Sequence, residues 1–134
     1  MIDHTGVIVS DFSKSKAFYS AALGAIGIAV RKEFPASVTG NTDVAGYGAP
    51  QTSAQGLSPE FWLARGEPGS TTVHVAFRVS SRALVDAFYS AAIAAGGRDN
   101  GAPGLRPQYH PHYYGAFVLD PDGHNIEAVC RAPA

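Results

Sequence analysis

Two histidines and a glutamate, His4, His74 and Glu127, are residues whose types could bind a metal ion together. Two neutral imidazoles and one carboxylate form a facial triad, which suits Fe(II), Mn(II), Ni(II) or Zn(II) and leaves coordination positions open. Substrate oxygens that bind in those positions are polarised by the ion. The competing interpretation is that both histidines have structural roles and that Glu127 faces solvent on a strand. The residue types and their spacing leave both interpretations open.

An internal repeat places the two histidines in equivalent positions. The hexapeptide Ala-Phe-Tyr-Ser-Ala-Ala occurs at residues 17–22 and again at 87–92, and the same offset of 70 residues relates His4 to His74. Self-similarity at a fixed offset indicates a repeated structural unit. We therefore expect His4 and His74 to occupy matching places in two copies of one unit.

Alternation of apolar and polar residues predicts which face of a strand these side chains occupy. In residues 73–79 the apolar residues alternate, so that His74 and Arg78 share the face away from the apolar layer. On the last predicted strand, the same alternation separates Glu127 from Ile126 and Ala128. His74 and Glu127 are thus both expected on the face turned away from the core.

The remaining elements follow the same order in each copy, a strand, a helix and then shorter strands. The second helix is predicted to begin near Ser80 or Ser81 and to end at two glycines, residues 96–97. Further strands are predicted at 30–34, 42–47 and 60–65 in the first copy, and at 115–119 and 125–131 in the second. The stretch Asp120-Pro121-Asp122-Gly123 predicts a turn that joins the last two strands into a hairpin.

Length, charge and cysteine content narrow the class of protein. A chain of 134 residues, 46% of them hydrophobic, is predicted to fold as one domain with its own core. A formal net charge of −1 argues against nucleic acid or an anionic membrane as a partner. Cys130 is the lone cysteine, which excludes an intrachain disulfide and fits a reducing compartment. Without a signal-peptide pattern or a long apolar run, we expect a cytoplasmic protein.

Taken together, the paired units, the histidine near the start of each, and the stretch from Asp120 to Glu127 resemble the vicinal oxygen chelate superfamily. This superfamily includes glyoxalase I, extradiol dioxygenases, and fosfomycin and bleomycin resistance proteins. The resemblance implies an α+β fold of two tandem βαβββ modules, residues 1–69 and 70–134, that form one curled mixed sheet around a cavity. It also implies one divalent metal ion per chain (Fe, Ni, Zn, Mn or Co) held by His4, His74 and Glu127, and a homodimer.

A fourth ligand is the feature that separates glyoxalase I from the dioxygenases in this resemblance. Glyoxalase I carries a glutamate on the last strand of its first module, and here either Glu60 or Trp62 fills that position, depending on the alignment. Both side chains point the same way because strands repeat every two residues. Glu60 as a ligand indicates an isomerase or lyase, whereas Trp62 leaves the open triad that an oxygen-using enzyme needs. Otherwise, Glu60 lies on a solvated strand edge and Trp62 is part of the core or the cavity wall.

Residues 106–114 gather histidines and tyrosines just before a predicted strand, a typical place for substrate contacts. Extradiol dioxygenases carry a histidine and a tyrosine ahead of the same Asp-Pro element, and His110 lies at a compatible distance from it. Phe117 stands where the tyrosine is expected, which weakens the resemblance to a dioxygenase unless Tyr113 or Tyr114 takes that role. Surface metal binding or packing at a dimer contact is the alternative for this segment.

Two functions from different classes remain open. The first is a metal-dependent lyase or isomerase, or a ring-cleaving dioxygenase, that acts on a small oxygenated molecule. In this hypothesis Glu60 or His110 is the general base, Tyr114 is a further catalytic residue, and Arg78 offers a cation to an anionic substrate. The other residues expected to contact substrate are Trp62, Tyr109 and Tyr113. The second function is a metal-free protein that binds an aromatic or antibiotic-like molecule in a cavity lined by Trp62, Tyr109, Tyr113 and Tyr114.

Overall fold

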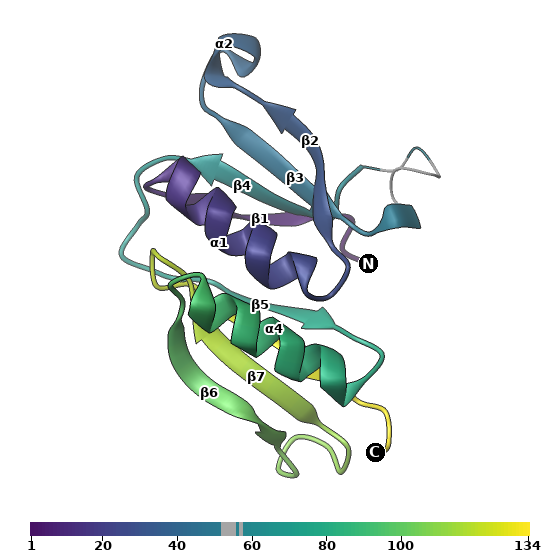
Figure 1. Ribbon diagram of the computed structural model, residues 1–134. Helices are drawn as coiled ribbons and strands as arrows, with labels where there is room; N and C mark the ends of the chain where they lie inside the picture. Colours follow the sequence, from purple (N-terminus) through teal and green to yellow (C-terminus); the bar gives the residue numbers. More distant parts are fainter. Residues whose placement is uncertain (52–55, 57) are drawn as a thin grey trace.

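The computed structural model describes residues 1–51, 56 and 58–134, and it consists of two similar modules (Figure 1). The first contains β1 (Thr5–Val9), α1 (Phe12–Gly24), β2 (Ala29–Phe34), α2 (Ala36–Thr39), β3 (Val44–Gly48) and β4 (Phe61–Arg65). The second contains β5 (His74–Arg78), α4 (Arg82–Ala94), β6 (Arg98–Leu105), β7 (Tyr114–Leu119) and β8 (Asn125–Cys130). The predicted α+β class and the two βαβββ modules are confirmed.

Each module forms a four-stranded mixed sheet. The strand orders are β1-β4-β3-β2 and β5-β8-β7-β6, so the first strand of each module pairs with the last. That pairing is parallel, whereas the other neighbours are antiparallel. The sheets are curled but not closed, and no strand pairing joins them within the described residues.

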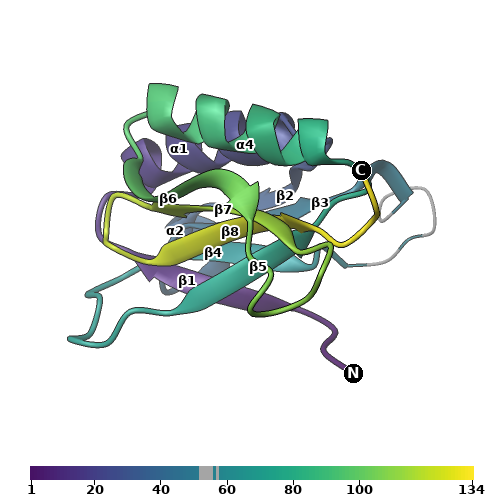
Figure 2. The ribbon, with the colours of Figure 1, turned by 90° about the horizontal axis from the view of Figure 1, so that it is seen from below.

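The helices cover one face of the sheets and leave the other face open. Figure 2 shows α1 and α4 side by side on the same side of both sheets. Alternate strand residues pack under the helices, as the predicted periodicity requires, and Val118, Ile126 and Ala128 are fully buried. The neighbouring residues on these strands, including Glu127, face the open side.

Side-chain caps set the beginnings of both long helices. The Asp11 carboxylate accepts from the backbone N–H of Lys14 (3.0 Å), and the Ser81 hydroxyl accepts from Leu84 (3.3 Å). The predicted start at Ser81 is therefore confirmed. After α4, Gly96 has a φ of 97°, a conformation that favours glycine and ends the helix.

Like the short helix α2, strand β6 was not predicted by the sequence pattern. It contains glycines at 101 and 104, and its pairing with β7 is irregular on both sides of Gly101. Such a segment has little strand propensity of its own. Backbone pairing with β7 stabilises it, which is a tertiary effect that periodicity cannot detect.

The predicted turn before β8 also joins the two modules. The Tyr19 hydroxyl on α1 donates to Asp120 (2.5 Å), and the Ser10 hydroxyl donates to Asp122 (2.6 Å). His124 is buried and donates from Nε2 to a backbone carbonyl of β1 (2.9 Å).

The described residues contain no helix that is long and apolar enough to cross a membrane.

Candidate functional site

Glu127, His74 and Tyr113 meet on the open face of the second sheet. Glu127 lies on β8 and is only 1% exposed. Its Oε2 is 2.9 Å from His74 Nε2, and its Oε1 accepts a short hydrogen bond from the Tyr113 hydroxyl. The His74 side chain is 51% exposed. The buried carboxylate thus contacts two side chains, the Tyr113 hydroxyl and the half-exposed His74 imidazole.

The strand register explains how these side chains share a face. Glu127 is paired with Phe117 on β7 and with Ala76 on β5, and Phe117 is paired with Gly101 on β6. These four residues form one row across the sheet, all directed away from α4. His74 lies two residues before Ala76 and points to the same side. The predicted faces of β5 and β8 agree with this arrangement.

Tyr113 is packed from several directions. The Arg131 guanidinium lies 4.9 Å from its ring centroid, and the Tyr109 ring lies 5.2 Å from it. Gly115 makes room for the Tyr113 ring and the Glu127 carboxylate, because a Cβ there would lie 3.1 Å from the ring and 3.2 Å from Glu127 Oε1. Burial, and next the hydrogen bond to Glu127, raise the pKa of Tyr113 to about 12. The phenol therefore remains a proton donor to the carboxylate at neutral pH.

The strand register also shows which residue of the first module matches Glu127. Gly6 is paired with Trp62 in the first module, and Ala76 is paired with Glu127 in the second. Because the repeat offset relates Gly6 to Ala76, Trp62 is the counterpart of Glu127. The Trp62 indole donates to a backbone carbonyl (3.0 Å), and its ring lies so close to Gly46 that a Cβ there would approach it to 2.8 Å. Trp62, not Glu60, therefore occupies the position equivalent to the carboxylate.

His4 lies apart from His74 and Glu127 in a single chain. Its Nδ1 is 2.7 Å from an Asp3 carboxylate oxygen, and both side chains are exposed. Strands β1 and β5 run in opposite directions, so their N-terminal ends lie on opposite sides of the molecule (Figures 1 and 2). No group of three His, Cys, Asp or Glu residues that could hold a metal ion occurs in the described part of the chain. One chain therefore unites two of the three predicted ligands.

The other predicted site residues are distributed around this centre. The Tyr114 hydroxyl donates to Asp86 on α4 (2.8 Å), so the structure places Tyr114 on the face opposite Glu127. His110 Nδ1 accepts from the backbone N–H of His112 (3.1 Å) in the loop before β7. Tyr109 is 63% exposed in the same loop, and Arg78 is exposed at the end of β5. Of these residues, Tyr109 packs against Tyr113, which in turn contacts Glu127.

The family model described as the Glyoxalase/Bleomycin resistance protein/Dioxygenase superfamily matches residues 1–128. The chain belongs to this superfamily. Among solved structures, a glyoxalase/bleomycin resistance protein from Albidiferax ferrireducens is 29% identical, with a TM-score of 0.71 over 97% of this chain and 98% of that one. No curated protein matches the chain significantly.

More distant members of the superfamily share the fold. A glyoxalase I mutant from Zea mays is 21% identical with a TM-score of 0.71, and the match covers 96% of this chain and 46% of that one. A mutant of the fosfomycin resistance protein FosX from Listeria monocytogenes, in a complex with Mn(II), is 18% identical with a TM-score of 0.66, over 96% of this chain and 90% of that one. These likenesses support the same architecture across members of the superfamily.

Two arginines that the sequence did not indicate as site residues lie beside Tyr113 and Phe117. Arg131 contacts Tyr113, and its even spacing from Glu127 was a signal for a shared face. Arg106 lies over the Phe117 ring, 5.5 Å from its centroid, and that ring is 6.1 Å from the His74 ring. Arg106 follows the unpredicted strand β6, so periodicity offered no signal for it.

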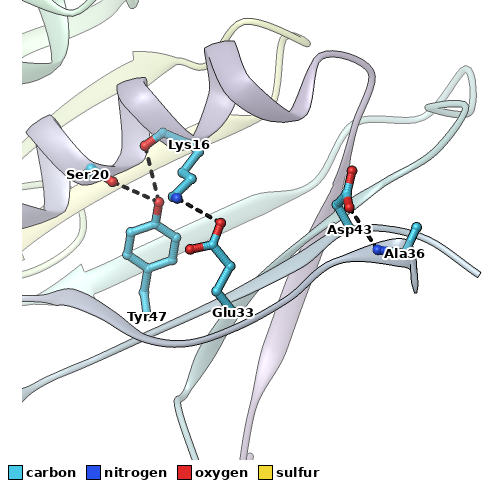
Figure 3. A network of polar contacts seen from close by, with 6 residues as sticks. All are labelled: Lys16, Ser20, Glu33, Ala36, Asp43 and Tyr47. Carbon is cyan, nitrogen blue, oxygen red and sulfur yellow. Dashed lines mark hydrogen bonds and ion pairs between the residues drawn. The ribbon is translucent and has the colours of Figure 1, made fainter. Parts of the chain in front are cut away.

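A separate pocket of about 370 Å³ lies in the first module, between α1 and β2. Phe12, Phe34, Pro35 and the acidic residues Glu33 and Asp43 line it. Both carboxylates have partners within the fold, since Lys16 donates to Glu33 (2.7 Å) and the backbone N–H of Ala36 donates to Asp43 (2.8 Å) (Figure 3). None of the predicted ligands lines this pocket. The Lys16 contact joins α1 to β2, and the Asp43 contact joins α2 to the residue before β3.

Proposed function

We propose that this chain is a divalent-metal-dependent enzyme that acts on a small oxygenated organic molecule. The observation that carries the proposal is the buried Glu127 carboxylate, held by Tyr113 and directed at the accessible His74 imidazole. Imidazole nitrogen and carboxylate oxygen together suit the borderline divalent ions Fe, Ni, Zn, Mn and Co. When bound, such an ion polarises two vicinal substrate oxygens and stabilises negative charge that develops on them.

The residues of the second module fit a cation. An ionised carboxylate that is 99% removed from solvent is costly unless positive charge compensates it. Tyr113 is a neutral phenol at pH 7, and the half-exposed His74 imidazole is positively charged only when it is protonated. A divalent ion held by His74 and Glu127 would supply the missing charge.

The third ligand in this proposal is His4 of a second copy of the chain. The opposite directions of β1 and β5 keep His4 away from His74 within one chain (Figure 2). A homodimer that lays the open face of one copy's first module against the second module of the other would bring the two histidines together. The exposed position of His4 and the open faces of both sheets support this arrangement.

Trp62 favours an open triad within this class of enzyme. As the counterpart of Glu127, it puts an indole where glyoxalase I has a carboxylate ligand. Three protein ligands leave more positions free for substrate and oxygen than four do. An open triad admits an oxygen-using enzyme as well as a lyase or isomerase, and in either case Glu60 or His110 would move the substrate proton.

Metal binding tests the proposed function directly. The apoprotein is titrated anaerobically with Fe(II), Mn(II), Ni(II), Co(II) and Zn(II), and the metal content and the free energy of unfolding are measured. A site present only in the folded state adds about 2.7 kcal/mol at a hundredfold excess over Kd. His74→Ala should abolish this gain, whereas the loop variant His112→Ala should keep it. No gain with any ion would refute the enzyme and support the metal-free binding protein.

Mixing two inactive variants tests whether the site spans two chains. His4→Ala and His74→Ala are each expected to lose tight metal binding. A mixture that exchanges subunits should recover one intact site in each heterodimer, at up to half the wild-type stoichiometry per dimer. No recovery after verified subunit exchange would show that both histidines act within one chain.

A further inference from the structure

We propose that Arg106 is an anion-binding residue, and that the substrate carries a carboxylate or a similar planar oxyanion in addition to its ion-binding oxygens. The inference rests on the proposed function, which it extends to the chemical class of the substrate.

Arg106 is half-buried on the same face of the sheet as Glu127. Its guanidinium lies over the Phe117 ring, and Phe117 is the direct strand partner of Glu127. The Phe117 ring is also 6.1 Å from the His74 ring. A molecule bound at His74 and Glu127 would therefore have a fixed cation next to it, across one aromatic side chain.

Two glycines of β6 create the space that the guanidinium occupies. A Cβ at Gly104 would lie 3.0 Å from Arg106 Nη1, and a Cβ at Gly101 would lie 3.3 Å from Nη2. Gly101 also has a φ of 145°, which favours glycine. The irregular, glycine-containing pairing of this strand thus leaves room for the planar guanidinium of Arg106.

The guanidinium has donors to spare. Nη2 donates to the backbone carbonyl of Ala102 (2.9 Å), and Nη1 makes one long contact with the carbonyl of Leu105 (3.5 Å). Within the described residues, no carboxylate forms an ion pair with Arg106. A guanidinium carries five N–H donors in a planar fork that matches a carboxylate. The remaining donors and the uncompensated charge therefore suit a planar oxyanion.

Arg106 is better placed for this role than Arg78, which the sequence analysis selected. Arg78 is opposite Val129 in the β5–β8 register, one row beyond Glu127, and is exposed at the strand end. Arg106 combines half burial, an anchored guanidinium and contact with the ring beside His74. Fixed geometry lowers the entropy lost when an anion binds.

Matched hydroxamates test the inference, because each binds a metal ion through two vicinal oxygens. Acetohydroxamate is neutral outside that group, whereas the monohydroxamates of succinate, glutarate and adipate add a carboxylate at increasing distance. Calorimetry on the Mn(II)-loaded protein should show at least one anionic probe binding about tenfold more tightly than acetohydroxamate, a difference of about 1.4 kcal/mol. Arg106→Gln should remove this preference and leave the acetohydroxamate Kd unchanged, and the distant control Arg65→Gln should change neither.

A second variant and a metal-free measurement keep the result decisive. Gly104→Ala retains the arginine but displaces its guanidinium, so it should lower the preference as well. In the apoprotein, succinate should produce a saturable NMR shift of the Arg106 side-chain N–H, which Gly104→Ala should weaken. Failure of acetohydroxamate to bind would count against the proposed function alone. Equal binding of all probes, a preference that survives Arg106→Gln, or no succinate shift would overturn the anion site.

Discussion

Glu127 has two oxygens in different surroundings, and this difference determines what each can do. Oε1 is closed off by Tyr113, which is 9% exposed and packed under Arg131. Oε2 faces His74, whose side chain is half exposed. Hydrogen bonds to one oxygen of a ligating carboxylate orient the other, and such supporting contacts affect metal affinity strongly. In the proposed enzyme, Tyr113 would therefore position Glu127, and its expected contact with substrate stays a prediction.

Tyr113→Phe removes the donor to Oε1 while keeping the ring. Metal affinity is expected to fall about 10- to 100-fold, because Glu127 loses its orientation. The free energy of unfolding should fall by about 1–3 kcal/mol, because a buried acceptor loses its partner. Calorimetric titration and urea unfolding measure the two effects. Tyr109→Phe, on the ring that packs against Tyr113, is the matched control, and an equal loss of affinity there would contradict the role of the Tyr113 hydroxyl.

The raised pKa of Tyr113 predicts a loss of stability in alkali. Its phenol ionises near pH 10 in the unfolded chain and at about 12 in the folded protein. Between these values the unfolded state binds fewer protons, so the contribution of Tyr113 is complete below pH 10 and is lost as the pH rises toward 12. The stability difference between wild type and Tyr113→Phe should thus be constant up to pH 9 and shrink above pH 10. Curves that stay parallel to pH 11.5 in urea unfolding would refute this.

At the scale of elements, the parallel pairing of the first and last strand of each module positions the site. The register pairs Ala76 with Glu127 and, in the other module, Gly6 with Trp62. One structural frame therefore presents a carboxylate in one module and an indole in the other. In the proposed metal site, the indole would leave three protein ligands where glyoxalase I has four.

Restoring a carboxylate at this position should strengthen metal binding. Trp62→Glu is expected to lower the metal Kd by at least about tenfold, or about 1.4 kcal/mol, if the first module faces the ion. Trp62→Gln loses the same packing over Gly46 without adding a charge, so it is the control. Equal affinities for the two variants, each shown to be folded by circular dichroism, would place Trp62 away from the ion.

At the scale of the whole molecule, the turn before β8 fastens the second module to the first. Asp120 is buried and accepts from the Tyr19 hydroxyl and from two backbone N–H groups of its own turn. Burial and the nearby Asp120 carboxylate raise the pKa of Tyr19, so the phenol stays a donor even in alkaline solution. The turn that resembles the superfamily motif thus has a structural role between modules, separate from the role proposed for Glu127.

Removing this contact should destabilise the fold without removing the ligands. Tyr19→Phe is expected to cost about 1.5–3 kcal/mol, the usual contribution of a hydrogen bond to a charged group. Asp120→Asn should cost a similar amount, and the double variant should cost less than the sum, because both changes break one contact. Urea unfolding of the four proteins measures the coupling. Additive losses would show that Tyr19 and Asp120 stabilise the protein independently.

The amino-acid sequence by itself determined the repeated modules, the faces of β5 and β8, and the hairpin turn, because these depend on local periodicity and turn chemistry. Alternation placed Glu127 and His74 on the face away from the core, whereas their contact depends on the pairing of β5 with β8. For residues whose roles depend on their neighbours in space, the sequence did not predict the contacts that the structure shows. Tyr113 and Tyr114 are adjacent in the chain, yet one contacts Glu127 and the other contacts α4.

Only the tertiary structure decided the strand register, the directions of β1 and β5, and the formation of β6. Register determined that Trp62 and not Glu60 matches Glu127, since a two-residue period cannot distinguish positions two residues apart. Strand direction separated His4 from His74 although the repeat makes them equivalent. Pairing with β7 ordered a glycine-containing strand and so created the place of Arg106. Each of these outcomes depends on contacts between distant segments, which local sequence patterns do not encode.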